Sequence, residues 1–218
     1  SLVSPDVIKL IPADAEKHDS AALALPQIME IIKSARQRDI DVVRLHSGEP
    51  AIYGSIGEQI GELKKAGIDF EVVPGISAFQ AAASALRKEL TMPNVAQAVI
   101  LTRAGGKTPV PEPQTPGNLA ASGATMCIYL STDRVEEIAG EIAGSYGPAC
   151  PAAVVYHASW PDEQIISGTL ADIAGKVKAA GISKTALILV GPALGEEDQR
   201  SLLYDQEFSH GFRKGKKK

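Results

Sequence analysis

Short apolar runs alternate along the chain with segments whose apolar residues recur every three or four positions. Three runs rich in β-branched residues predict strands in the first half: 41–45, 68–73 and 97–103. Between the first two, Ile56, Ile60 and Leu63 lie on one helical face, and Gly67 is expected to end that helix. Strands that alternate with helices predict parallel pairing with right-handed crossovers.

The alternation stops at 104–117 (AGGKTPVPEPQTPG) and then resumes. Four prolines and three glycines make this stretch unsuitable for a helix or a central strand, so it predicts a linker. Later apolar runs predict four further strands: 125–130, 152–157, 164–168 and 185–191. Thr169 and Asp172 resemble a capping box for the helix that follows them.

These patterns predict an α/β protein of two domains. The first domain is expected at 1–103, the linker at 104–118 and the second domain at 119–195. The remainder, 196–218, is expected to be a charged, flexible tail, because five of the 22 basic residues stand in its last six positions.

Composition excludes several classes of protein. A hydrophobic share of 44% excludes a disordered chain, and no apolar run approaches the roughly 20 residues that cross a bilayer. The formal net charge is −4, so the chain lacks the overall positive charge that is typical of nucleic-acid-binding proteins. The two cysteines form no CxxC pair, and Cys127 is expected to be a buried apolar residue in a reducing cytosol.

The chain lacks the common nucleotide and hydrolase motifs. It contains no GxGxxG, GxxxxGK[ST], HExxH or GxSxG, and its four histidines have no metal-ligand spacing, so we expect no metal site. His46 and His157 each end a predicted strand, where an imidazole serves equally well as an acid, a base, an anion contact or a structural group.

Four loops that follow predicted strands combine small residues with proline. They are 46–50 (HSGEP), 74–78 (PGISA), 157–162 (HASWPD) and 191–193 (GPA). Each alone is ordinary turn chemistry, because glycine and proline are frequent between a strand and a helix. Four together indicate a ligand site, since open α/β sheets bind ligands beyond the carboxyl ends of their strands.

The segments VVRLHSGEPAIYGSIGEQ, VVPGISAFQAAASAL, LTRAGGKTPVPE, VVYHASWPDE and LILVG together resemble the tetrapyrrole methylases. The resemblance extends from residue 1 to about residue 194. It implies S-adenosylmethionine-dependent methyl transfer to a tetrapyrrole, with S-adenosylhomocysteine as the second product. It also implies two α/β domains with the site between them, in a cytoplasmic homodimer that binds neither nucleic acid nor a membrane.

Two of these segments favour one branch of the family. LTRAGGKTPVPE and HASWPDE are similar to the members that methylate C-11 of precorrin-4, or of cobalt-precorrin-4, in cobalamin synthesis. Sirohaem-type members are expected to carry an Asn-Gly-Thr-like turn where this chain has residues 157–159. Methylation of another tetrapyrrole, such as uroporphyrinogen III, is the alternative within the same fold.

The resemblance also implies roles for individual residues. The expected cofactor contacts, mostly through backbone atoms, are Ser47, Gly48, Glu49, Ile52, Ser77, Ala78, Leu130, Ala158 and Ala193. Glu49 stands where the family usually has Asp, so its carboxylate reaches one methylene further. The candidates for moving a proton near the cofactor loop are Glu49, His46 and Tyr53.

The carboxylates of a tetrapyrrole require cationic and aromatic partners. The candidates for binding the substrate are Arg44, Arg103, Lys107 and Trp160. Arg44 and His46 are expected on one face of their strand, because side chains alternate along a strand. Solvated-linker and core-packing roles are equally open for Lys107 and Trp160.

Family members begin with a further strand and a GAGPGD-like loop, ahead of the segment that opens this chain. The resemblance therefore predicts that the first sheet here lacks a central strand. On that basis the 218 residues alone are expected to bind S-adenosylmethionine weakly. An inactive fragment or a binding module is the alternative to an enzyme.

Overall fold

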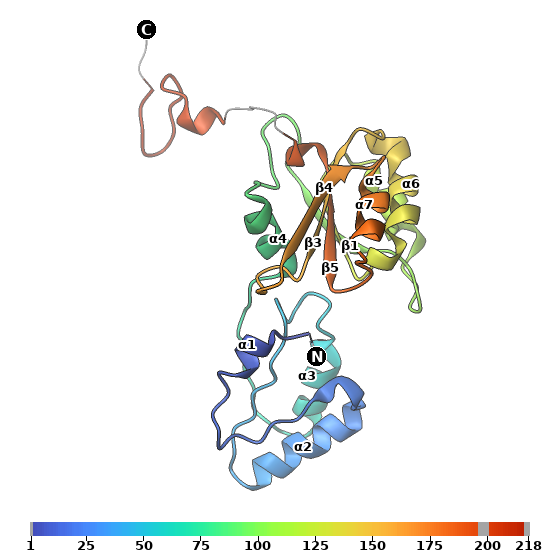
Figure 1. Cartoon of the computed structure of the whole chain (residues 1–218). Helices are drawn as coiled ribbons and strands as arrows, with labels where there is room; N and C mark the ends of the chain where they lie inside the picture. Colours follow the sequence, from blue (N-terminus) through green and yellow to red (C-terminus); the bar gives the residue numbers. More distant parts are fainter. Residues whose placement is uncertain (1, 196–200, 216–218) are drawn as a thin grey trace. The chain divides into compact units, whose positions relative to one another are not determined.

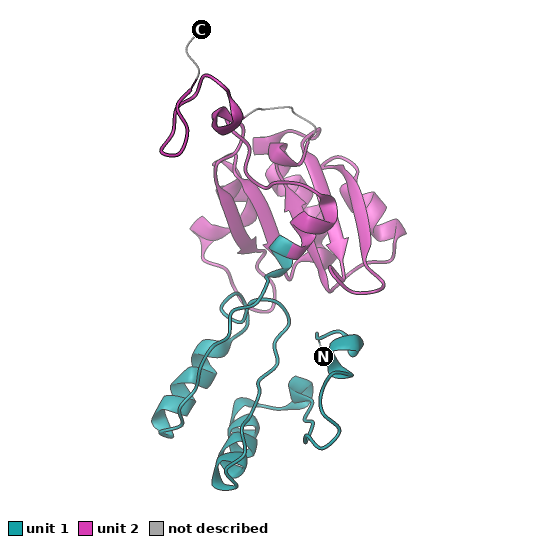
Figure 2. Cartoon of the chain, turned by 90° about the vertical axis from the view of Figure 1, so that its left-hand side faces the viewer, with its two compact units in different colours: residues 1–80 teal, residues 81–218 magenta. Residues whose placement is uncertain are grey.

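The computed structural model describes residues 2–195 and 201–215, which belong to two compact units. Unit 1 contains residues 1–80 and unit 2 contains residues 81–218 (Figure 2). Part of the predicted tail, 196–200 and 216–218, lies outside the described residues.

Unit 2 is built on one mixed five-stranded sheet (Figure 1). Its strands are β1 (Val99–Arg103), β2 (Thr125–Tyr129), β3 (Pro151–Tyr156), β4 (Gln164–Thr169) and β5 (Ala186–Val190). The spatial order is β1-β2-β5-β3-β4, in which only β1 and β2 pair in parallel and the other pairs are antiparallel. Because β2 and β3 both run opposite to β5, β1, β2 and β3 all point the same way.

The core of unit 2 lies between this sheet and three helices on one of its faces. These helices are α5 (Pro116–Ala120), α6 (Val135–Tyr146) and α7 (Ile173–Ala179) (Figure 1). Met126 and Ile188 of the sheet pack in one cluster with Ile138 and Ile173 of the helices, and all four are at most 1% exposed. Burial of each such side chain stabilises the fold by about 1.5–3 kcal/mol.

Neighbouring residues define the ends of two unit 2 helices. Helix α6 ends at Tyr146, and Gly147 follows it at φ +81°. The Thr169 N–H donates to the Asp172 carboxylate at 2.7 Å, which is the predicted contact, but α7 begins only at Ile173. Cys127 is fully buried as predicted, and burial raises the pKa of its thiol to about 12.

Unit 1 contains helices and extended chain, and no strand is assigned between residues 2 and 80. Its helices are α1 (Pro5–Ile8), the 3-10 turn η1 (Ser20–Ala22), α2 (Leu25–Gln37) and α3 (Ile56–Lys65). Helix α3 and its terminal Gly67, at φ +64°, match the prediction. Helix α4 (Ala78–Leu86) begins in unit 1 and continues into unit 2.

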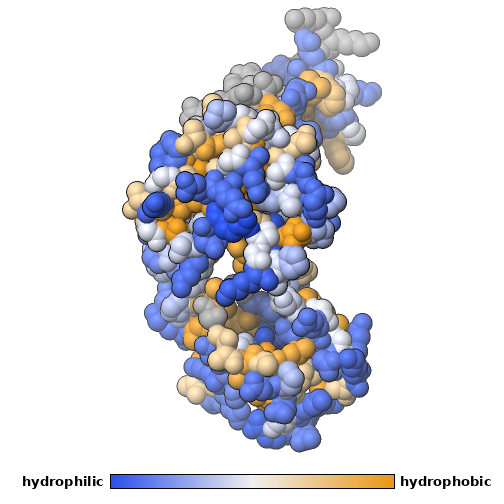
Figure 3. Space-filling view, turned by 90° about the vertical axis from the view of Figure 1, so that its right-hand side faces the viewer, coloured by the Kyte–Doolittle hydropathy of each residue, from blue (hydrophilic) through white to orange (hydrophobic). Residues whose placement is uncertain are grey.

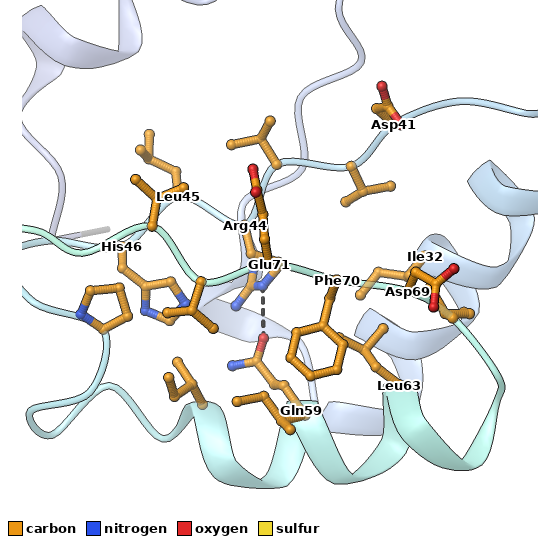
Figure 4. Close-up of a pocket in the computed structure, with 18 of the residues that line it drawn as sticks. Ile32, Asp41, Arg44, Leu45, His46, Gln59, Leu63, Asp69, Phe70 and Glu71 are labelled. Atoms are coloured by element: carbon orange, nitrogen blue, oxygen red, sulfur yellow. Dashed lines mark hydrogen bonds between the residues drawn. The ribbon is translucent and has the colours of Figure 1, made fainter.

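The predicted strands at 41–45 and 68–73 are not formed, so the expected parallel pairing of this half is wrong. Both segments are extended, yet from residue 41 to 48 and from 69 to 74 no backbone-to-backbone hydrogen bond is made within the described chain. They flank a cavity of about 940 Å³, whose other walls are α2 and α3 (Figure 4). Paired strands lie only about 4.7–4.9 Å apart, and chains on opposite sides of a cavity do not form a ladder.

The third predicted strand of the first half belongs to unit 2. The run 97–103 forms β1, which pairs with β2 from Val99 opposite Thr125 to Arg103 opposite Tyr129. The predicted boundary after residue 103 therefore differs from the observed one after residue 80.

The predicted linker 104–118 also belongs to unit 2, where it returns to the sheet. It contains the 3-10 turn η2 (Glu112–Gln114) and the start of α5. The Thr102 hydroxyl donates to the Gln114 carbonyl at 3.3 Å, so this segment is a loop within unit 2.

The described residues contain neither a membrane-spanning helix nor a cluster of metal ligands. No helix among them is long and apolar enough to span a bilayer. No three of their His, Cys, Asp and Glu side chains come together as metal ligands.

Large apolar side chains remain exposed on unit 1, and the face seen in Figure 3 carries hydrophobic residues among hydrophilic ones. Val43 and Val73, on the two extended segments, are 84% and 68% exposed, whereas Leu189 of β5 is 0% exposed. The two segments therefore lack both the main-chain bonds and the burial that hold the sheet of unit 2.

We predict a corresponding contrast in hydrogen exchange. The amides of 41–46 and 69–74 should exchange close to the rate of an unstructured chain, because no ladder protects them. The amides of β5 should be among the slowest, because β2 and β3 pair with it on both sides. Exchange followed by mass spectrometry measures both, and equal protection of the two regions would contradict this structure.

Candidate functional site

Two predicted cofactor loops of unit 1, 46–50 and 74–78, lie against each other through their main chains. Gly48 has φ +70°, and a side chain on it would lie 3.5 Å from the Ile76 carbonyl oxygen. A Cβ atom on Gly75 would lie 2.2 Å from the Gly48 carbonyl oxygen. The close contact leaves no room for a side chain at Gly75, and the left-handed φ favours glycine at position 48.

The Glu49 carboxylate joins these two loops. One oxygen accepts the Ala51 N–H at 2.9 Å, and the other accepts the Gly75 N–H at 2.8 Å. These two bonds lower the pKa of Glu49, so the group is a carboxylate at neutral pH. The geometry gives Glu49 a positioning role for the loops, and its predicted part in proton transfer stays a prediction.

The other predicted contacts of unit 1 stand on or next to the same loops. Ser77 is buried at the start of α4, where its N–H donates to the Gln80 side chain at 2.9 Å. Ala78 is half-buried beside it, and the Ile52 N–H donates to the Glu49 carbonyl at 3.1 Å. Unit 1 thus collects its six predicted cofactor residues in one place, with Ser47 and Gly48 exposed to solvent.

Arg44 and His46 line the cavity of unit 1 and both point towards α3, as the alternation predicts (Figure 4). Arg44 Nε donates to the Gln59 side-chain oxygen at 3.0 Å. Burial and the charge of Arg44 lower the pKa of His46, so this imidazole is neutral at pH 7. Tyr53 lies further along the chain in the left-handed region, at φ +55° and 43% exposed.

In unit 2 the carboxyl ends of β1, β2 and β3 meet the start of β5 at one edge of the sheet, which we call the carboxyl edge. Neighbouring chain ends are tied together there. The Ala104 N–H donates to Ser131 Oγ at 2.8 Å, in a buried bond between the ends of β1 and β2. Thr132 Oγ1 donates to the Ala186 carbonyl at 3.0 Å. The His157 N–H donates to the Thr185 carbonyl at 3.1 Å.

Leu130 is the predicted cofactor contact at the end of β2. Its backbone adopts φ +53°, and its side chain is 69% exposed. A left-handed conformation is costly for a branched residue, and exposure of an apolar side chain gains nothing in the free protein. Its role as a cofactor contact stays a prediction.

The loop after β3 carries Ala158 and Trp160. His157 and Ser159 adopt φ +48° and +70° on either side of the half-buried Ala158. Trp160 packs against the His157 ring, with ring centroids 4.2 Å apart. The Ser159 N–H donates to the Glu163 carboxylate at 2.7 Å, so the loop has a defined shape.

Arg103 and Lys107 occupy the loop after β1. The Arg103 guanidinium donates to the Thr108 and Pro109 carbonyls at 3.1 and 2.8 Å, so it holds the loop around itself. Lys107 is exposed on the same loop. Arg103 is the last residue of β1 and Lys107 follows it in the loop, so both lie at the carboxyl edge.

Ala193 does not join the carboxyl edge. It is 1% exposed in the 3-10 turn η4 (Pro192–Leu194), which follows the far end of β5. Since β5 runs opposite to β2 and β3, this end lies at the other edge of the sheet, where the Gly191 N–H donates to the Pro151 carbonyl. The sequence analysis expected all four loops on the same side of the sheet, because it assumed parallel strands. That assumption is wrong for β5, which is antiparallel to β2 and β3.

One pair of interacting side chains was not predicted from the sequence. His157 Nδ1 lies 2.9 Å from the Asp162 carboxylate, five residues later in the same loop. The sequence offered one signal for this pair, a histidine at the end of a predicted strand followed by an acidic residue. The contact also depends on the left-handed conformations of His157 and Ser159, which the sequence did not predict.

The sequence and the fold of this chain are similar to those of known proteins. The family described as Tetrapyrrole (Corrin/Porphyrin) Methylases matches residues 1–174. A Methanocaldococcus jannaschii protein named Cobalt-precorrin-4 C(11)-methyltransferase is 47% identical over 100% of this chain and 85% of its own length. The solved structure of a cobalt precorrin-4 methyltransferase superposes with a TM-score of 0.87 at 40% identity, over 89% of this chain and 82% of that one.

A more distant solved structure is the uroporphyrin-III C-methyl transferase of Thermus thermophilus, in complex with S-adenosylhomocysteine. It superposes with a TM-score of 0.62 at 26% identity, over 76% of this chain and 72% of that one. The likeness to this chain is therefore weaker in both sequence and shape than that of the precorrin-4 methyltransferases.

The first prediction of this site concerns Glu49. Glu49→Gln should loosen the contact between the two loops, because it replaces one of the two accepting oxygens with an NH2 group that faces an N–H donor. S-adenosylmethionine should then bind about tenfold more weakly. Calorimetric titration measures this change. Glu58→Gln, which neutralises an exposed carboxylate of α3, is the matched control and should bind as the parent does.

The parent protein should show the same loosening only in acid. A lowered pKa means that the bonded carboxylate stabilises the loops above the unfolded pKa and that this stabilisation is lost as pH falls through the folded pKa. The Gly75 amide of the parent should therefore keep its protection at neutral pH and lose it only in acid below the usual range in which a glutamate carboxyl titrates. Gly75 protection that is unchanged by both Glu49→Gln and acid would contradict the joining role.

A second prediction concerns the carboxyl edge. Ser131→Ala leaves the buried Ala104 N–H without its partner, which should lower the free energy of unfolding by roughly 1–3 kcal/mol. Urea denaturation measures the change. Ser145→Ala, at an exposed position of α6, should stay within about 0.5 kcal/mol of the parent. Equal stability of the two variants would show that the Ser131 bond does not hold this edge.

Proposed function

Because the chain belongs to the tetrapyrrole methylase family, we propose that it transfers a methyl group from S-adenosylmethionine to C-11 of precorrin-4, or of cobalt-precorrin-4. The observation that carries this proposal is the 47% identity along the whole chain with a protein named for that reaction. The TM-score of 0.87 with a cobalt precorrin-4 methyltransferase, against 0.62 with the uroporphyrin-III enzyme, supports the same branch of the family.

The two contacting loops of unit 1 fit the proposed cofactor. The glycines bring main-chain N–H and C=O groups to the surface where a side chain would block them. S-adenosylmethionine, when bound, supplies an activated methyl group on a positively charged sulfur. We assign its contacts in unit 1 to Ser47, Gly48, Glu49, Ile52, Ser77 and Ala78.

In unit 2 we assign the cofactor contacts to Leu130 and Ala158, and we leave Ala193 out because it lies at the other edge of the sheet. The exposed Leu130 side chain offers an apolar surface to a ligand. Ala158 lets a ligand approach the main chain between two left-handed residues.

Methyl transfer to carbon demands mainly alignment. The donor carbon and the acceptor carbon must lie about 3–3.5 Å apart and in line, and such positioning supplies roughly 7–11 kcal/mol of the barrier reduction. The rigid turns at 46–50, 74–78 and 157–163 are suited to this task, because hydrogen bonds fix each of them.

The substrate carries acetate and propionate groups, for which we propose Arg44, Arg103, Lys107 and Trp160 as partners. The terminal nitrogens of Arg44 make no hydrogen bond among the described residues and are available to a carboxylate. Arg103 shapes its loop, and the exposed Lys107 on that loop is the cation that reaches solvent. The homodimer and the cytoplasmic location implied by the family stay predictions.

The test compares three acceptors with one preparation of the protein. Incubation with S-adenosylmethionine should add one methyl group to precorrin-4 or cobalt-precorrin-4 and release an equal amount of S-adenosylhomocysteine, both measured by mass spectrometry. Uroporphyrinogen III should react at least about 10²-fold more slowly. Faster turnover of uroporphyrinogen III, or no turnover of any acceptor, would contradict the proposal.

Two glycine variants provide a structural control for this assay. Gly75→Ala should abolish turnover, because its Cβ would lie 2.2 Å from the Gly48 carbonyl oxygen and force the two loops apart. Gly57→Ala should leave turnover unchanged, because no atom lies within 4 Å of a Cβ at that position of α3.

A further inference from the structure

The loop after β3 holds the His157 imidazole in one orientation. Its ring stacks on Tyr156, with centroids 3.7 Å apart and planes 17° apart, and Trp160 packs against it at 4.2 Å. The Trp160 N–H donates to the His157 carbonyl at 2.8 Å, which closes the turn. The side chain of His157 is only 13% exposed.

Asp162 fixes the tautomer of this ring. Its two carboxylate oxygens lie 3.0 and 2.9 Å from Nδ1, so the neutral imidazole carries its proton on Nδ1 and donates it to Asp162. Nε2 makes no hydrogen bond within the part of the chain that the structure describes, and it therefore presents a lone pair. The remaining charged group of this loop, Glu163, is bound to the Ser159 N–H.

Within the described residues His157 uses Nδ1 alone, so Nε2 is available to a ligand. The turn that positions it is also strained, because His157 and Ser159 both adopt positive φ without being glycine. His157 stands at the carboxyl edge, tied to the start of β5 by its own N–H. An aspartate that orients a histidine with a free second nitrogen is the arrangement of a general base.

Methyl transfer to a conjugated macrocycle requires such a base. As the bond from the ring carbon to the methyl carbon forms, the carbon–sulfur bond breaks and its electron pair stays on sulfur. The macrocycle thereby gains a CH3⁺ unit, and loss of one proton restores its charge. The proton needs an acceptor, which becomes an imidazolium when that acceptor is histidine.

We propose that His157 is a catalytic residue of this reaction, whose Nε2 takes the proton that the methylated macrocycle releases, and that Asp162 is the positioning residue that orients it. This inference rests on the proposed function. The imidazolium is stabilised by the Asp162 carboxylate and returns its proton to solvent after each turnover.

The experiment replaces His157 by asparagine, which tolerates the left-handed backbone and still donates to Asp162, but has no basic nitrogen. We expect kcat for methylation of precorrin-4 to fall by about 10²–10⁴-fold, with the KM for S-adenosylmethionine within about threefold of the parent. The pH profile of kcat that the parent shows should be changed in His157→Asn, because the variant has no basic nitrogen to take up the proton.

Asp162→Asn provides the second variant, since it retains the base and removes only the group that fixes its orientation. Its kcat should fall by about tenfold or more while the shape of the parent's pH profile is retained. Asp14→Asn, an exposed position of unit 1, is the matched control and should keep the parent kcat. Binding of S-adenosylmethionine by calorimetry shows whether each variant is folded.

The outcomes separate the two proposals. A parent that methylates precorrin-4, together with a His157→Asn variant that keeps kcat within about twofold and the same pH profile, overturns the role of His157 alone. A parent that methylates no precorrin overturns the proposed function and this inference with it. Loss of activity in His157→Asn through a raised KM for precorrin-4 alone, with kcat unchanged, assigns His157 to substrate binding and also overturns the base.

Discussion

The insertion of β5 between β2 and β3 is the constraint on which unit 2 depends. Its apolar run is buried, and its main chain pairs with a neighbour on each side. Strands lie about 4.8 Å apart, so the ends of β2 and β3 are held roughly 10 Å apart across the start of β5. Carbonyls at residues 185 and 186 accept from His157 and Thr132 and so fix both loops. Leu130 and His157 therefore lie on opposite sides of the start of β5.

Unit 1 orders its predicted cofactor loops by different means. It has no ladder, and its two extended segments flank a cavity lined also by α2 and α3. The loops that end those segments are nevertheless precise, because Gly75 permits main-chain contact and Glu49 joins the two turns. The replacement of the family's aspartate by glutamate falls at this joint, where the longer side chain reaches two N–H groups at once.

Local patterns predicted local structure well. The spacing of Ile56, Ile60 and Leu63 located α3, and the apolar run at 125–130 located β2. The identity of strand partners was less predictable, because pairing depends on distant segments: 97–103 joined unit 2, and the reversed direction of β5 placed Ala193 at the far edge. Leu130 and His157 have positive φ, and His157 contacts Asp162, because of the turns in which they lie. The residue types in these turns do not predict those conformations. The resemblance to the family located the loops. The contact between His157 and Asp162 within one of them became visible only in the three-dimensional structure.

The position of the transferred carbon tests the central claim most directly. With S-adenosylmethionine labelled with ¹³C in its methyl group, the account predicts one new methyl signal, correlated by NMR with C-11 of the corrin precursor. A label on any other ring carbon, or on a nitrogen or oxygen atom, would contradict methyl transfer to C-11 by this protein.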